Sequence, residues 1–206
     1  MKTKAKIIIT AIELFNLHGT KSTSTNHIAK EMGISPGNLY YHFRSKNDII
    51  RSIVDNFSNE LGSVFQFRLD TIYDFSDNLT SLFNRFFKIQ RSYQFLFLEG
   101  VHLTKQDQKL FDNYTKLRSL IKAGYHELLA NLVKIKIMKK QSLKIIDDLL
   151  DLQWIIMWYW INHTVLDRKI YDEFQIKKGI KLSFSIIKPQ LTSIGKIAFD
   201  KTLQTL

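Results

Sequence analysis

The chain has 206 residues, of which 45% are hydrophobic and 24% are charged, and its formal net charge is +11. This is the composition of a globular protein large enough for a core of its own, and only two prolines over this length favour long helices. The absence of cysteine excludes disulfides, thiolate metal sites and cysteine nucleophiles.

The positive charge is spread along the chain. Residues 1–60 hold eight basic and five acidic side chains, and residues 61–206 hold 22 and 14. A basic protein favours a polyanionic partner, but this distribution gives the N-terminal segment no special share. One run of lysines without acids is interpreted as a solvated loop between helices: Lys134, Lys136, Lys139, Lys140 and Lys144.

No segment predicts a membrane partner. The longest uncharged stretch, Leu152–Leu166, has fifteen residues, fewer than the roughly 18 that argue for a membrane span. The N-terminal apolar run ends at Glu13 without a small-residue cleavage site. We therefore expect a cytoplasmic protein.

Capping signals divide the first 61 residues into four predicted helices. The first covers 2–18, with Ile8, Ala11, Ile12 and Phe15 on one face, and Gly19 ends it. A Ser/Thr run at 22–25 caps a second helix that reaches Met32. Ser35 caps a third helix with Pro36 at its first position, and Ser45 caps a fourth.

Longer and more aromatic helices are predicted after about residue 66. Their approximate ranges are 76–91, 94–103, 106–136, 142–166 and 172–188, with a further short helix within 190–206. No linker composition interrupts the chain, so we expect the junction between the two parts to be a continuous or closely packed helix.

The stretch from Ile28 to Lys46 has the spacing of a helix-turn-helix. Ala29 is small where two helices approach, Gly33 permits the turn, and Leu39 anchors the second helix. The positions between these anchors carry short or hydrogen-bonding side chains suited to base edges and phosphates: Ser35, Gly37, Asn38, Tyr41 and His42. Periodicity alone would also fit two helices of an ordinary bundle.

This segment resembles the DNA-binding domain of TetR-family transcriptional regulators, over about the first quarter of the chain. The matching residues are Gly19, Thr23, 28–31, 33–35, 37–43 and Lys46. The resemblance implies an all-α fold, with an N-terminal three-helix helix-turn-helix DNA-binding domain plus a C-terminal helical ligand-binding and dimerisation domain. The corresponding domains are residues 1–48, with the helix-turn-helix at about 25–43, and residues 49–206.

The resemblance also implies which residues contact DNA. They are Thr23, Ser24 and Thr25 at the start of the second helix, Ser35, Pro36, Gly37, Asn38, Tyr40, Tyr41 and His42 in the third, and Lys46 at the start of the fourth. Tyr40 is equally compatible with a packing role. Many members of the family carry Lys or Arg where this chain has Pro36, so base contacts do not transfer directly.

The C-terminal part is rich in aromatic side chains that suit an apolar pocket. The residues predicted to line it are Phe87, Phe95, Glu99, His102, Tyr125, Trp154 and Trp158. For any single one, a place in the core or in a dimer interface is the simpler interpretation. Trp160 lies off the helical face of Trp154 and Trp158, so we expect it to meet a different partner, such as a second subunit. No spacing predicts a metal site or a cofactor.

The resemblance implies a homodimeric, ligand-responsive regulator that binds a palindromic double-stranded DNA operator. A repressor released by an apolar or aromatic small molecule is the leading interpretation, and an activator of the same fold is the alternative. A helical enzyme acting on an apolar substrate is a distant third, because no nucleophile–base motif or phosphate loop is present. A basic protein that coats DNA without sequence preference is a further alternative.

Overall fold

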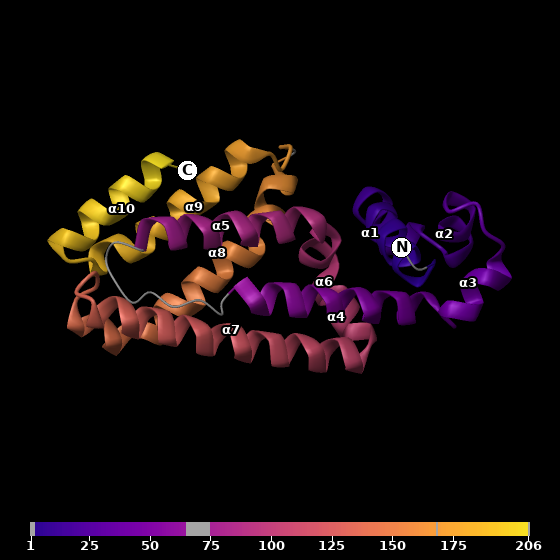
Figure 1. Ribbon diagram of the computed structural model, residues 1–206, viewed down its shortest axis with the longest axis horizontal. Coiled ribbons are helices and arrows are strands. Elements are labelled where there is room, and N and C mark those ends of the chain that lie inside the picture. Colours follow the sequence, from indigo (N-terminus) through magenta and orange to yellow (C-terminus); the bar gives the residue numbers. More distant parts are fainter. Residues whose placement is uncertain (1–2, 65–74, 168, 206) are drawn as a thin grey trace. The chain divides into compact units, whose positions relative to one another are not determined.

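The computed structural model describes residues 3–64, 75–167 and 169–205. Within these ranges the chain forms ten α-helices and two short 3₁₀ helices (Figure 1), and no strand longer than an isolated bridge. The all-α prediction is therefore confirmed. None of the described helices has the length and apolar character needed to cross a lipid bilayer.

The helices follow the predicted order. They are α1 (Thr3–Ser22), α2 (Thr25–Glu31), α3 (Pro36–His42), α4 (Lys46–Val64), α5 (Phe75–Ser92), α6 (Gln94–Gln106), α7 (Gln108–Lys134), η1 (Lys140–Ile145), α8 (Ile146–Leu166), α9 (Glu173–Ile187), η2 (Lys188–Gln190) and α10 (Ser193–Thr205). The segment predicted to be helical from 142 begins as the 3₁₀ helix η1, and α8 starts only at Ile146. The junction predicted near residue 66 lies outside the described residues.

The chain divides into two compact units. Unit 1 comprises residues 1–61 and 89–117, and unit 2 comprises residues 62–88 and 118–206. Unit 1 thus combines α1 to α3 and most of α4 with α6 and the start of α7.

The core of unit 1 is built on α1. Ile7, Ala11 and Phe15 are buried at a spacing of four, whereas Ile8 and Ile12 of the predicted face are only partly buried. The Phe15 ring packs 5.2 Å from that of Phe95 in α6. The Asn16 side chain donates to the carbonyl of Ser92 at 2.8 Å and accepts from the N–H of Phe95 at 2.9 Å, which fixes the start of α6 on α1.

In unit 2, α8 and α9 pack closely. A Cβ at Gly179 would lie 2.6 Å from Cδ1 of Trp160, so only glycine permits this approach. The indole Nε1 of Trp160 donates to the carbonyl of Gln175 at 2.7 Å. Trp160 therefore has a partner in α9 of its own chain, and a contact with a second subunit stays a prediction.

The last helix is held by polar contacts around an isolated bridge between Met138 and Leu191. The Thr192 hydroxyl donates to the Lys136 carbonyl at 2.7 Å, and the N–H of Thr192 donates to the Ile137 carbonyl at 3.0 Å. These bonds fix the beginning of α10 against the segment that follows α7.

Candidate nucleic-acid interface

The helix α2 is capped at its N-terminus by the predicted Ser/Thr run. Ser24 is the N-cap residue, and its hydroxyl accepts from the N–H of His27 at 3.2 Å. The His27 ring accepts in return from the N–H of Ser24 at 3.4 Å, which completes a capping box. The hydroxyl of Thr25 lies 3.1 Å from that of Tyr40 and so links α2 to α3.

The turn between α2 and α3 is a Schellman motif. Gly33 has a φ of +65°, its N–H donates to the Lys30 carbonyl, and the N–H of Ile34 donates to the Ala29 carbonyl, each at 3.0 Å. A left-handed residue is needed here to close both bonds, which explains the glycine.

One face of the helix α3 packs against the protein, and its N-terminal end is exposed. Ser35 accepts the N–H of Asn38 at 3.2 Å, and Pro36 takes the first helical position as predicted. Leu39 is buried beneath the helix. The predicted contact residues Ser35, Pro36, Gly37 and Asn38 are all exposed at its N-terminal end.

Two tyrosines of α3 differ in exposure. The side chain of Tyr41 is 86% exposed, and its ring lies edge-on to that of His42 at 5.1 Å. Tyr40 is 48% exposed and its hydroxyl is already paired with Thr25. Tyr41 is thus free to reach a partner in solution, whereas Tyr40 also holds α2 and α3 together.

The side chains of Thr23 and Lys46 donate hydrogen bonds to backbone carbonyls near the end of α1. Thr23 is buried, and its hydroxyl donates to the Gly19 carbonyl at 2.9 Å. The Lys46 Nζ donates to the carbonyls of Thr20 at 2.6 Å and Thr23 at 3.0 Å. In this geometry both side chains stabilise the connection between α1 and α2, since their polar atoms are already used there.

The same connection is held by α6. The Glu99 carboxylate accepts from the N–H of Thr20 at 3.1 Å and from its hydroxyl. Glu99, which was predicted to line a pocket, thus orients the backbone just before α2.

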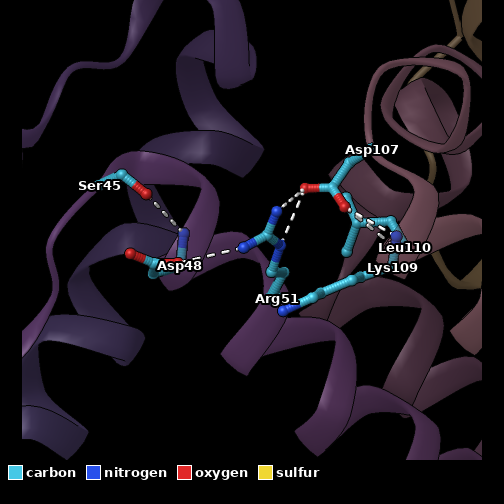
Figure 2. A network of polar contacts seen from close by, with 6 residues as sticks. All are labelled: Ser45, Asp48, Arg51, Asp107, Lys109 and Leu110. Atoms are coloured by element: carbon cyan, nitrogen blue, oxygen red, sulfur yellow. Dashed lines mark hydrogen bonds and ion pairs between the residues drawn. The ribbon is translucent and has the colours of Figure 1, made fainter.

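A second polar network fixes the start of α4 (Figure 2). Arg51 donates from Nε to Asp107 at 2.9 Å and from Nη1 to Asp48 at 3.3 Å. Asp107 also accepts from the N–H groups of Lys109 and Leu110 at the start of α7. Burial alone would raise the pKa of Asp107, but the bonds from Arg51 and these N–H groups outweigh it and lower the pKa.

One exposed cation beside α3 is absent from the predicted set. Arg44 lies on the exposed turn between α3 and α4, two residues after His42. A guanidinium at this place can reach a phosphate with a planar pair of donors. Its position directly after the recognition segment is the signal by which sequence reasoning could have found it.

The seven residues predicted for an effector pocket are divided between the two units: Phe95, Glu99 and His102 belong to unit 1, and Phe87, Tyr125, Trp154 and Trp158 belong to unit 2. Phe95 and Glu99 contact α1, and His102 is an exposed residue of α6. Trp154 and Trp158 stack on each other at 4.6 Å. Phe87 packs in unit 2 against Phe83, at 6.4 Å between rings, and against Phe86.

A small apolar cavity does lie within unit 2, and Tyr125 is the predicted residue that lines it. Its volume is about 30 Å³, room for about two water molecules. The other lining residues are Leu82, Phe83, Leu128, Leu129, Leu132, Leu149, Gln153, Phe184, Ile187 and Phe199. Burial of the Tyr125 hydroxyl raises the pKa of this group.

Comparison with known proteins places both parts of the chain. Residues 7–53 match the family model described as "Bacterial regulatory proteins, tetR family", and residues 56–199 match the model "Bacterial transcriptional repressor". A TetR-family transcriptional regulator from Marinobacter aquaeolei VT8 superposes with a TM-score of 0.88 at 26% identity. That alignment covers 99% of this chain and 98% of the other.

Two relatives match over shorter segments. The HTH-type transcriptional regulator AcrR of Shigella flexneri is 33% identical over 63 residues, which are 31% of this chain and 29% of the relative. The HTH-type transcriptional repressor KstR2 of Mycolicibacterium smegmatis is 36% identical over 73 residues, which are 35% of this chain and 36% of the relative. The chain thus aligns with about a third of the length of each.

Proposed function

The chain belongs to the tetR family of bacterial regulatory proteins, and on this basis we propose that it is a ligand-responsive, sequence-specific DNA-binding repressor. The observation that carries the proposal is the exposed N-terminal end of α3, with Tyr41 projecting beside it. Buried Leu39 and the Ser35 cap hold this helix rigidly, so its polar groups can enter a major groove in one orientation.

Repression is favoured over activation because the M. smegmatis relative is named a repressor. The protein would act in the cytoplasm, where the operator is accessible. The effector would bind more tightly to a second conformation that has low affinity for the operator. Effector binding would therefore shift the protein towards that conformation and release it from the DNA. We propose that the effector site lies in unit 2, around the cavity that Tyr125 lines.

We propose that two copies associate through α8 and α9. These helices expose large apolar side chains at helical spacing, which association of two copies would remove from water. They are Leu152, Ile155, Tyr159, Phe174 and Leu182. Two recognition helices about 34 Å apart would then meet successive turns of a palindromic operator.

An unbiased selection of bound DNA from a random pool tests the function. We expect enrichment of one palindromic sequence, bound at moderate salt far more tightly than random DNA. Equal affinity for all sequences with a steep salt dependence would contradict this proposal and favour a DNA-coating protein. A transcription assay on the selected operator separates the two remaining cases, because a repressor lowers and an activator raises the output.

A further inference from the structure

A groove with a mixed lining lies between α9 and α10 in unit 2. Its volume is about 200 Å³, several times that of the inner cavity. The residues that line it are Lys181, Phe184, Ser185, Lys188, Leu191, Lys196, Phe199, Asp200 and Leu203. The groove is preformed, because the bonds of Thr192 to Lys136 and Ile137 hold the beginning of α10 in place.

The rim of the groove is positively charged. Lys188 lies 3.5 Å from Asp200, whereas no acidic side chain in the described part of the chain pairs with Lys181 or Lys196. The sequence holds no Asp or Glu from residue 174 to residue 199. Two ammonium groups without an acidic partner therefore face a groove that can supply them with an anion.

The floor of the groove is apolar. Phe184 and Phe199 contact each other at 4.7 Å between rings, and both also line the inner cavity. Leu191 is buried beside them, and Leu203 continues the apolar lining along α10. A ligand in the groove would therefore touch the wall of the inner cavity.

We propose that this groove binds an amphiphile with an anionic head group, a carboxylate or a phosphate, and a short unbranched apolar tail. Lys181 and Lys196 bind the head, and the tail lies along Phe184, Phe199 and Leu203. The amphiphile would be the effector of the proposed regulator. Its binding in the groove does not depend on the proposed function, whereas its effect on DNA binding rests on that function.

Titration calorimetry on the full chain tests the site with octanoate below its micelle concentration, 1-octanol, butyrate and octyl phosphate. We expect one octanoate to bind per chain. The affinities for 1-octanol and butyrate should each be lower by at least about tenfold, because 1-octanol lacks the anionic head group and butyrate lacks most of the apolar tail. Comparison of octanoate with octyl phosphate identifies the preferred head group.

Variants locate the binding. The double variant K181Q/K196Q should lower the affinity for octanoate by about tenfold or more and leave the affinity for 1-octanol unchanged. The double variant K134Q/K201Q is the matched control, because it removes the same charge from exposed lysines outside the groove. Its affinity for octanoate should equal that of the original chain, and thermal unfolding checks that both variants fold.

Equal affinities for octanoate and 1-octanol, or equal losses in the two double variants, would overturn the proposal. Calorimetry needs no DNA, so its outcome is independent of the operator selection. A chain that selects an operator but binds no octanoate or octyl phosphate would refute this inference alone. A chain that binds octanoate at Lys181 and Lys196 but selects no operator would refute only the function.

Discussion

At the level of single residues, Tyr41 offers the clearest test of the DNA-binding surface. Its side chain is 86% exposed and its ring lies edge-on to the neighbouring His42 ring. We expect Tyr41→Ala to weaken operator binding by about tenfold, the value of one good contact, without changing the melting temperature. Leu17→Ala is the control, because Leu17 is 74% exposed on α1 and lies outside α3. Fluorescence anisotropy with operator DNA measures both, and equal affinities would contradict the assignment.

Lys46 and Arg44 lie two positions apart and should behave differently. Lys46→Ala leaves the carbonyls of Thr20 and Thr23 without their donor, and we expect a loss of about 1–3 kcal/mol in the free energy of unfolding. Arg44→Ala removes an exposed side chain and should leave that free energy unchanged. It should instead weaken binding to all DNA sequences and reduce the salt slope by about 1. Urea unfolding and DNA titrations at several salt concentrations separate the two, and a stable Lys46→Ala chain would refute the structural role.

At the level of elements, the turn before α3 depends on one backbone angle. Gly33 has a φ of +65°, and a Cβ there would meet no atom within 4 Å. The cost of Gly33→Ala is therefore purely conformational, and we expect the free energy of unfolding to fall by about 1 kcal/mol.

Gly37→Ala provides the matched comparison. Gly37 lies within α3 with ordinary helical geometry, and its nearest neighbour to an added Cβ is the Ser35 hydroxyl at 3.9 Å. Alanine should stabilise the helix by up to about 1 kcal/mol. Thermal unfolding of both variants decides the point, and equal shifts in the same direction would contradict the account of the turn.

The joint between α4 and α7 is expected to respond to pH. The pKa of Asp107 is lowered in the folded protein, so its ionised form stabilises the fold above about pH 4, and this contribution is lost as the pH falls further. Asp107→Asn keeps an amide oxygen for the N–H groups of α7 but loses the charge that pairs with Arg51. We expect a cost of about 1–2 kcal/mol at pH 7 that shrinks towards pH 3. Denaturant unfolding of both chains at pH 7 and pH 3 measures this difference in the free energy of unfolding. A difference that does not depend on pH would show that it does not arise from the charge of Asp107.

At the level of the whole molecule, the apolar side chains on α8 predict a dimer. Ile155 is 55% exposed in the single chain, so a charge there costs nothing in the monomer but would be buried in the proposed interface. We expect Ile155→Asp to convert the dimer to a folded monomer and to abolish operator binding. Analytical ultracentrifugation checks the mass, with Ile9→Asp on α1 as the control at 44% exposure. A dimeric Ile155→Asp chain would place the interface elsewhere.

The parts of this molecule that were predicted correctly depend on short-range interactions. Ser24, Ser35 and Ser45 each accept an N–H three residues later, and Gly33 closes α2 through its own φ. Such contacts leave a local pattern in the residue types. The arrangement of the site depends also on Lys46 and Glu99, whose partners lie between 23 and 79 positions away. Nothing in their neighbourhood encodes that pairing, because it arises only when α1, α4 and α6 pack together.

The cavity of unit 2 limits the rate at which an effector bound in the groove between α9 and α10 can extend into the interior of the unit, because Phe184 and Phe199 line both. With a volume of about 30 Å³, it admits nothing larger than about two waters until its lining side chains separate. When opening precedes entry, the observed association rate rises with effector concentration only until it equals the rate of opening. The highest rate of entry into the cavity would then be set by the movement of side chains such as Phe184 and Phe199. A further increase in effector concentration could not raise it.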